Sequence, residues 1–482
     1  MTSLLDAPPT GSADKGVTSL RLQRCKAPIY CKPPKVGPVT LNDPTTLESV
    51  RVAFDAKNPL ALAAALRAAF PVDPDYERID QWVRFVLFGG APPQTDRAET
   101  LELISSIQET QQRKVDERPL RPRARGHSGV ALEFLADESG LPQWTMAFFL
   151  NQLTLASVKP SRRYAVVATM RDDGIYILEF IAYYLALGFE HVFIYTNDNR
   201  DDSDALLGAL AEHGIITVIE NDISGFVEPE AKAFGHALNR LADLRDFEWV
   251  LFVDSDEYLM PAPEHGFSID RYVTALEAAH PDGLTAAVLF DWLWFVSDFT
   301  LQRASGTLYE RFEHARPHWL PKTLVRLAHL DSMRCQHHPE VRQGYRVVDS
   351  GLGEVDMTTI WERKTPNYSG GWMSHYWPKS FEEFLVKKAR GATLKMEQNF
   401  FDRPYDKFFI WNGHAHLETR YPAASSVLTV HHAEINRLRS LPGIAALADR
   451  IDEEFRHMVA SISGEGMLER LYAQHRTEPG PL

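Results

Sequence analysis

The stretch from Trp249 to Leu259 constrains the fold of this chain more than any other. Trp249 to Val253 is an unbroken apolar run, mostly β-branched and aromatic, which predicts a strand buried on both faces. The run ends in three carboxylates, Asp254, Asp256 and Glu257. A buried parallel strand places such residues at the carboxyl edge of its sheet, where open α/β sheets bind ligands. Two carboxylates there suit Mg²⁺ or Mn²⁺ shared with phosphates, although a solvated acidic turn has the same pattern.

Composition excludes several classes of protein. A chain of 482 residues is too long for one ordinary core, so we expect two or three domains. The net charge of −14, with no long basic block, disfavours nucleic acid as a partner. Three cysteines cannot form a disulfide framework, and no apolar run is long enough to be an integral membrane segment. We therefore expect a soluble cytoplasmic protein, and leave open a peripheral position on the inner face of the membrane.

Alternating strands and helices surround the acidic stretch. The expected strands cover residues 164–169, 191–195, 215–219 and 249–253, and the expected helices cover residues 175–187, 204–212 and 231–244. This alternation predicts an α/β fold, with a mostly parallel sheet flanked by helices. No G-x-G-x-x-G follows the first strand, and G-x-x-x-x-G-K-[ST] is absent, so dinucleotide and P-loop chemistry are disfavoured.

Several short motifs follow one another in a recognisable order. They are Arg171-Asp-Asp-Gly174, Tyr195-Thr-Asn197, Asp254-Ser-Asp256-Glu257, Trp292-Leu-Trp-Phe295 and His375-Tyr-Trp-Pro-Lys379-Ser380. In this order and spacing they resemble the family 2-like and family 92 glycosyltransferases of GT-A fold, over residues 163–391. Asp172 and Asp173 stand where the family has Asn-Glu, and Thr196 replaces the first acid of a Tyr-Asp-Asn cluster. These departures leave the acidic motif intact but affect the expected contacts to base and ribose.

Composition and periodicity divide the chain into regions, and the resemblance implies an activity. We expect a flexible tail (1–44), a helical accessory domain (45–160), a GT-A catalytic domain (161–395) and a helical C-terminal extension (396–482). The implied enzyme is a metal-dependent, inverting glycosyltransferase of polysaccharide biosynthesis. It would move a sugar from a nucleotide-diphosphate sugar, a UDP-sugar first of all, to a glycan or another hydroxyl acceptor. The N-terminal helices are candidates for homo-oligomer contacts.

The resemblance also assigns roles to residues. Asp256 and His375 are the expected ligands of Mn²⁺ or Mg²⁺, and Asp254 contacts the ribose or the metal. The expected substrate-binding residues are Arg171, Asn197, Asp254, Lys322, Lys379 and Trp292. An inverting reaction needs a carboxylate base near the acceptor hydroxyl. Glu310 is preferred for that role, and Asp291 and Asp298 are the other candidates, although Glu310 could instead form an ion pair with Arg311.

Two other functions fit part of the pattern. A sugar-nucleotidyltransferase shares the sheet and its acidic edge, but it would need a Gly-rich loop with a basic residue after the first strand. A non-catalytic module that binds glycans or organises a synthase would not need Asp254, Asp256 and His375 together. Nucleotide release from a sugar nucleotide separates these alternatives.

Overall fold

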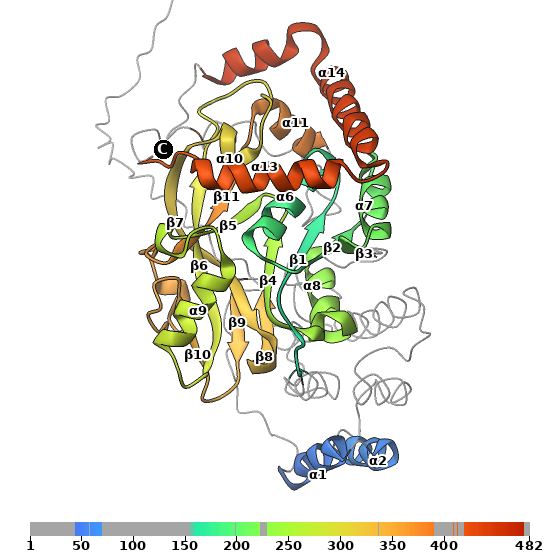
Figure 1. The fold of residues 1–482 in the computed structure, drawn as a ribbon, viewed down its shortest axis with the longest axis vertical. Coiled ribbons are helices and arrows are strands. Elements are labelled where there is room, and N and C mark those ends of the chain that lie inside the picture. Colours follow the sequence, from blue (N-terminus) through green and yellow to red (C-terminus); the bar gives the residue numbers. More distant parts are fainter. Residues whose placement is uncertain are drawn as a thin grey trace, which may run out of the picture.

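The structure is a computed structural model. It describes residues 44–69 except 57, residue 155, residues 158–389 except 198, 222–228 and 336, residues 408 and 412, and residues 419–476. Most of the expected tail and accessory domain therefore lies outside the described residues. Within the accessory domain, two expected helical segments are present as α1 (Pro44–Asp55) and α2 (Pro59–Ala69), which pack on each other. Figure 1 shows this pair apart from the sheet.

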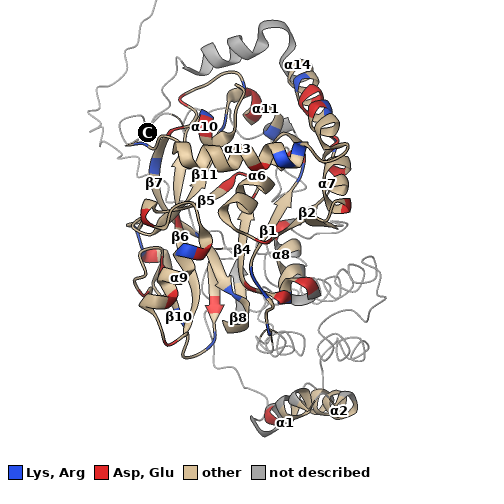
Figure 2. Cartoon of the chain, viewed as in Figure 1, with Lys and Arg blue, Asp and Glu red and all other residues tan. Residues whose placement is uncertain are grey.

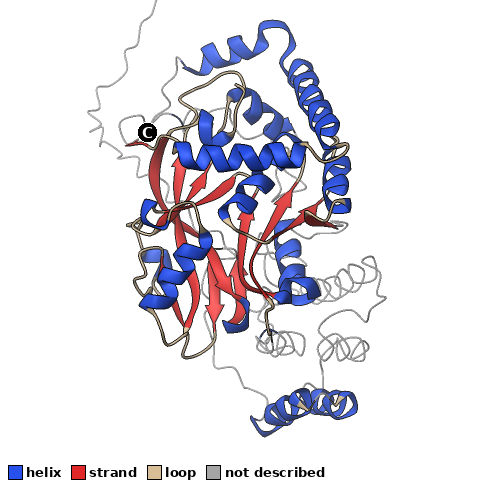
Figure 3. Cartoon of the chain, viewed as in Figure 1, coloured by secondary structure: helices blue, strands red, loops and turns tan. Residues whose placement is uncertain are grey.

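A large mixed sheet forms the centre of the described protein (Figure 3). Its strands are β1 (Arg162–Met170), β2 (His191–Thr196), β3 (Ile216–Glu220), β4 (Phe247–Asp254), β5 (Glu257–Pro261), β6 (Thr285–Phe295), β7 (His314–Arg326), β10 (Arg346–Asp349), β11 (Gly371–His375) and β12 (Thr419–Arg420). The order is β3-β2-β1-β4-β7-β6-β11-β5, with β10 on β6 and β12 on β7. A separate pair is formed by β8 (Leu330–Cys335) and β9 (His338–Val341).

The predicted α/β class is confirmed, but the sheet is mixed. Strands β3, β2, β1 and β4 are parallel, as the alternation of strands and helices predicted. Beyond β4, strand β7 is antiparallel to both its neighbours, and β5 is antiparallel to β11. The parallel half follows from the crossover helices between its strands. In the second half β5 begins three residues after β4 ends, too short a connection for a parallel crossover.

Helices cover both faces of the sheet (Figure 3). They are α6 (Gly174–Leu187), α7 (Ser203–Glu212), α8 (Pro229–Arg240), α9 (Ile269–Ala279), α10 (Leu308–Arg311), α11 (Phe381–Ala389), α13 (Ser425–Arg439) and α14 (Ile444–Arg476), with short 3₁₀ turns η4 (Ala242–Asp246), η5 (Pro263–His265), η6 (Leu327–His329) and η7 (Ile360–Glu362). The expected helix 231–244 ends early, because Leu241 is extended and η4 follows it. The expected helix 175–187 ends at the same residue as α6, and Gly188 caps it in the left-handed region (φ 107°). Figure 2 shows charged residues on the outer helices, with both signs along α14.

Two apolar layers explain the unbroken apolar runs. Alternate residues of β4 face opposite layers: Trp249, Leu251 and Val253 pack under α6, α7, α9, α13 and α14, whereas Val250 and Phe252 pack under α8. Both faces of the strand are therefore buried, as the run predicted. The described part of the expected C-terminal extension contains α13 and α14, and Figure 1 shows α13 lying across α6. Across the described helices, none combines the length and apolarity needed to cross a bilayer.

Candidate active site

The acidic motif lies where the parallel half of the sheet meets the mixed half. Asp254 ends β4, and Glu257 begins β5. Strand β11 pairs with β5 so that His375 lies opposite Glu257, and it pairs with β6 so that His375 also lies opposite Trp294. Residues more than a hundred positions apart thus meet at one edge of the sheet. The predicted convergence of His375 with the acidic motif is therefore present in the structure.

Asp256 is the most heavily contacted carboxylate of the motif. Its side chain is buried, and its Oδ2 accepts from Lys387 Nζ at 2.7 Å and Lys379 Nζ at 3.4 Å. Burial alone would raise the pKa of Asp256, but the ammonium groups of Lys387 and Lys379 outweigh it and hold the pKa well below its usual range. The carboxylate is therefore ionised and neutralised by two lysines.

His375 faces the other oxygen of Asp256. Its Nε2 lies 3.6 Å from Asp256 Oδ1, which is too long for a hydrogen bond. Burial lowers the pKa of His375, so the imidazole is neutral near pH 7. Its Nδ1 is buried and has no hydrogen-bond partner among the described residues. A neutral imidazole beside an ionised carboxylate is a donor pair suited to a divalent cation.

Asp254 and Glu257 share a different lysine. Lys322 of β7 is fully buried, and its Nζ lies 3.0 Å from Asp254 Oδ2 and 3.1 Å from Glu257 Oε2. Burial lowers the pKa of Lys322, but the two carboxylates outweigh it and keep the ammonium charged. Glu257 also accepts the Asp254 backbone N–H at 2.9 Å, so it holds the turn in shape. Lys322 therefore holds the side chains of Asp254 and Glu257 in position.

Lys379, one of the two lysines on Asp256, also packs against an aromatic ring. Lys379 is buried, with its Nζ 4.3 Å from the ring centre of Tyr176. Tyr176 donates to Glu383 at 2.7 Å, and Glu383 also forms a bidentate pair with Arg311. Glu383 and Lys387 are four residues apart on α11 and so share one face of that helix. This spacing was the available signal for Lys387 and Glu383, neither of which was singled out from the sequence.

Aromatic rings form the wall on the β6 side. The Trp292 ring centre lies 4.5 Å from that of His375 and 5.1 Å from that of His337. Trp294 stacks on His318 at 3.9 Å and 13°. The Nε1 of Trp292 is buried and, within the described chain, has no hydrogen-bond partner. Trp292 is thus beside the proposed metal ligands, as expected for a substrate-binding residue.

The remaining predicted binding residues follow the ends of β1 and β2. Arg171 and Asn197 are both partly buried there. The turn after β1 is fixed to the loop after β2, because Arg200 forms a two-pronged pair with Asp172 at 2.9 and 2.7 Å. Asp173 Oδ2 accepts from Ser255 at 2.8 Å, which ties the same turn to the acidic motif. The two acids that depart from the family pattern thus have defined partners.

The base candidates Glu310 and Asp291 are both held in structural interactions. Glu310 Oε2 accepts the backbone N–H of Thr307 at 2.8 Å, which caps α10, and its Oε1 contacts His432 at 2.8 Å. The suggested Glu310–Arg311 ion pair is not the one that forms, since Arg311 pairs with Glu383. Asp291 is buried and binds Arg363 at 3.0 and 2.6 Å. Burial raises the pKa of Asp291 to about 7, against the pull of the Asn367 amide and Arg363.

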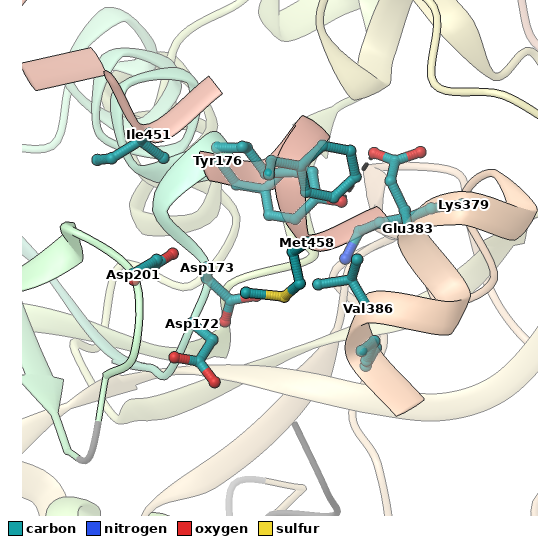
Figure 4. A pocket seen from close by; sticks show the side chains of 12 residues that line it. Asp172, Asp173, Tyr176, Asp201, Lys379, Glu383, Val386, Ile451 and Met458 are labelled. Atoms are coloured by element: carbon teal, nitrogen blue, oxygen red, sulfur yellow. Dashed lines mark hydrogen bonds between the residues drawn. The ribbon is translucent and has the colours of Figure 1, made fainter. Parts of the chain in front are cut away.

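A pocket opens beside these groups (Figure 4). It encloses about 450 Å³ of space, its open mouth included. Its lining comes from the turn after β1, the loop after β2, the lysines of the α11 region and one side of α14. No cluster of three or more His, Cys, Asp or Glu side chains that could hold a metal occurs among the described residues.

Comparison with known proteins supports the resemblance found in the sequence. Residues 167–349 match the family model for glycosyltransferase family 92. A Ricinus communis protein named as a glycosyltransferase family 92 protein is 29% identical over 93 residues, which are 19% of this chain and 16% of that protein. The chain therefore spans only a small part of that relative. The family resemblance is confirmed for the matched region, which contains the acidic motif.

Two solved structures resemble the chain weakly. Staphylococcus aureus TarS 1–349 is 12% identical, covering 65% of this chain and 91% of that one, with a TM-score of 0.24. Glucosyl-3-phosphoglycerate synthase from Mycobacterium tuberculosis, in complex with Mn²⁺, UDP-glucose and phosphoglyceric acid, is 14% identical. That match covers 56% of this chain and 91% of that one, with a TM-score of 0.25. Scores of this size carry no inference about activity.

Proposed function

We propose that this chain, whose residues 167–349 match glycosyltransferase family 92, transfers a sugar from a nucleotide-diphosphate sugar to a hydroxyl acceptor. The donor we favour is a UDP-sugar, and the acceptor is a glycan or another hydroxyl compound. The reaction depends on Mn²⁺ or Mg²⁺ and inverts the anomeric centre. The observation that carries the proposal is the meeting of Asp256, His375, Lys379 and Lys387 at the carboxyl edge of β4, in a chain with this family match.

The metal is supported by a donor pair rather than by a complete set of ligands. Asp256 Oδ1 and His375 Nε2 face each other, and the Nδ1 of His375 has no partner among the described residues. Mg²⁺ and Mn²⁺ sites that act on phosphates use one or two protein ligands, with water and substrate oxygens supplying the rest. Asp256 Oδ1 and His375 Nε2 would therefore be enough protein ligands for such an ion. A divalent ion bound there would stabilise the negative charge that develops on the leaving diphosphate.

The lysines supply the remaining positive charge. In the ligand-free arrangement Lys379 and Lys387 neutralise Asp256. With a divalent ion on Asp256, the ammonium groups of Lys379 and Lys387 would be available to phosphate oxygens, which Lys binds as a point charge. Lys379 is the less mobile of the two, because it is buried and rests on the Tyr176 ring. Lys322 keeps Asp254 and Glu257 in place and does not reach Asp256 in this arrangement.

The catalytic base would be a carboxylate near the acceptor hydroxyl. Glu310 and Asp291 are two of the candidates from the sequence, and both carboxylates have structural partners. For Glu310, burial raises the pKa, but hydrogen bonds from Thr307 and His432 outweigh it and lower the pKa. A lowered pKa makes a weaker base. Trp292, whose ring centre lies 4.5 Å from that of His375, is the candidate for packing against a pyranose.

Nucleotide release tests the proposed function. The purified chain is incubated with Mn²⁺ and each of a panel of nucleotide-diphosphate sugars, with and without a glycan mixture, and free nucleoside diphosphate is measured. We expect release from at least one donor, its loss on chelation of the metal, and its loss in Asp256→Asn. Anomeric configuration of the product, read by NMR, tests inversion.

Each alternative function gives a different result. Release of pyrophosphate from a nucleoside triphosphate and a sugar phosphate would identify a nucleotidyltransferase. A chain that binds glycans but releases nucleotide from no donor would be a non-catalytic module. Either result would refute the proposed transfer.

A further inference from the structure

The C-terminal helix α14 lines the pocket beside the acidic motif. It contributes Ile451, Phe455 and Met458 to the lining. The opposite lining comes from Asp172 and Asp173 in the turn after β1. Figure 4 shows Met458 reaching into the space between that turn and the α11 region. The family match ends at residue 349, so this wall comes from a part of the chain to which the match gives no role.

Two ion pairs and a hydrogen bond hold α14 in place. Asp452 pairs with Arg303 at 3.0 Å, Arg450 pairs with Asp202, and Glu454 accepts the Asp202 backbone N–H at 3.0 Å. These contacts attach the helix to the loop after β2 and to the segment after β6. Phe455 also lies under the Arg303 guanidinium, 5.4 Å from the ring centre.

A glycine permits the close approach of α14 to the turn. A Cβ at Gly174 would lie 2.7 Å from Ile451 Cγ2 and 2.7 Å from Asp201 Oδ2. Contacts that short do not occur, so a side chain at this position would push the helix away. Gly174 also donates its backbone N–H to Asp201 at 3.1 Å. A side chain at position 174 would therefore force Ile451, Asp201 or α14 itself to shift.

The pocket presents different chemistry on its different sides. Lys379 and Lys387 line the side that adjoins Asp256, and both contact its carboxylate. Asp173 and Asp201 supply carboxylate oxygens near the ends of β1 and β2. The α14 side is apolar. A nucleoside diphosphate has the matching sequence of groups: a charged diphosphate, a ribose with two hydroxyls and a flat base.

Sheet topology points to the same ligand. The chain runs outward from β1 to β2 and β3 and then returns to add β4 on the other side of β1. The crevice between the carboxyl ends of β1 and β4 is therefore a topological switch point, the usual ligand position in open α/β sheets. Asp172 and Asp173 follow β1, and the acidic motif follows β4. The pocket reaches this crevice from the α14 side.

We infer that α14 forms the outer wall of the nucleoside half of the donor site, with Phe455 and Met458 contacting the base. The inference rests on the proposed function, because it takes the ligand to be a nucleotide. It adds two specificity-determining residues from the C-terminal extension. It also makes the seating of α14 a condition for tight donor binding, since the same helix face contacts the turn, the loop and the ligand.

Calorimetric titration of the full chain tests whether Phe455 and Met458 contact the base. UDP, GDP and ADP are titrated in the presence of Mn²⁺, and the tightest of them is carried into the variants. Loss of an aromatic stacking contact to a base costs about 5- to 150-fold in affinity, which is the effect expected for Phe455→Ala. Met458→Ala should weaken binding about 3- to 10-fold, because a thioether gives a smaller contact with a ring.

Two controls separate the wall from the rest of the site. His457 lies on the same helix with 79% of its side chain exposed, so His457→Ala should change the affinity less than about twofold. Inorganic pyrophosphate with Mn²⁺ should bind wild type and Phe455→Ala equally, because it has no base. Melting temperatures without ligand establish that each variant is folded. If Phe455→Ala unfolds, then Met458→Ala, whose side chain is only partly buried, decides.

The possible failures are distinguishable. If wild type binds none of the three nucleotides, the proposed function fails and this inference fails with it. If wild type binds a nucleotide and both variants bind it with unchanged affinity, the wall is refuted while the proposed function stands. An equal loss of nucleotide and pyrophosphate affinity in Phe455→Ala would show that the residue supports the whole site, which also overturns a contact to the base.

Discussion

Asp256 should matter for stability as well as for activity. Lys379 is 4% exposed, and its nearest ionised partner is the Asp256 carboxylate. Burial lowers the pKa of Lys379, and Asp256 opposes that effect most strongly. The substitution Asp256→Asn keeps the shape of the side chain and removes its charge. It leaves a buried ammonium without its main counter-charge.

The size of the effect follows from the contacts. Breaking a buried ion pair by removing one partner costs about 3–5 kcal/mol. We expect the lower end, about 3 kcal/mol, for two reasons. Asp173 and Glu383 also raise the pKa of Lys379, so they replace part of the lost charge. Lys387 is 23% exposed, so its ammonium group can turn toward solvent. The matched control is Asp254→Asn. Asp254 is 33% exposed, and Glu257 Oε2 would stay 3.1 Å from Lys322 Nζ, so that loss should be smaller than the loss in Asp256→Asn.

Urea unfolding of the full chain measures the difference. Tryptophan fluorescence is the readout, because Trp292 and Trp294 lie beside His375. The double variant Asp256→Asn, Lys379→Met should recover most of the lost stability, because it removes the stranded charge. A loss below about 1 kcal/mol in Asp256→Asn, or one equal to that of Asp254→Asn, would refute the reasoning.

Three further predictions concern other parts of the site. Burial raises the pKa of Glu383, but Arg311 outweighs it and lowers the pKa from 4.5 to about 2. The ionised Glu383 therefore contributes on the order of 3 kcal/mol to the free energy of unfolding above pH 4.5, and this contribution is lost as pH falls toward 2. In urea unfolding between pH 5 and pH 2, the free energy of unfolding of Glu383→Gln should depend less on pH than that of wild type. Gly174→Ala should displace α14 and weaken nucleoside diphosphate binding about tenfold or more, whereas Gly208→Ala on α7, where a Cβ meets nothing within 4 Å, should leave calorimetric affinity unchanged. If Glu310 is the base, Glu310→Gln lowers kcat about 10²- to 10⁴-fold with donor affinity near wild type; a larger loss in Asp291→Asn moves the role to Asp291, and insensitivity of both excludes both.

The sequence alone determined the parallel half of the fold and the position of the acidic motif. The run from Trp249 to Val253 predicted a strand buried on both faces, and its residues do alternate between two apolar layers. The expected helix 175–187 ends where α6 ends, and the order of motifs predicted the family match. These features depend on local periodicity, on turn chemistry and on residue order. Each of them can be read from neighbouring residues in the sequence.

Only the tertiary structure decided which charges meet. The two lysines on Asp256 come from positions 379 and 387, and the third lysine binds Asp254 and Glu257 instead. Ion pairing depends on distances across strands and helices, which residue spacing does not determine. The same holds for Glu310, whose carboxylate caps α10, and for α14, whose apolar face joins the pocket 200 residues after the acidic motif. Long-range packing set these contacts, because burial brings together whichever side chains the sheet and its helices place at one edge.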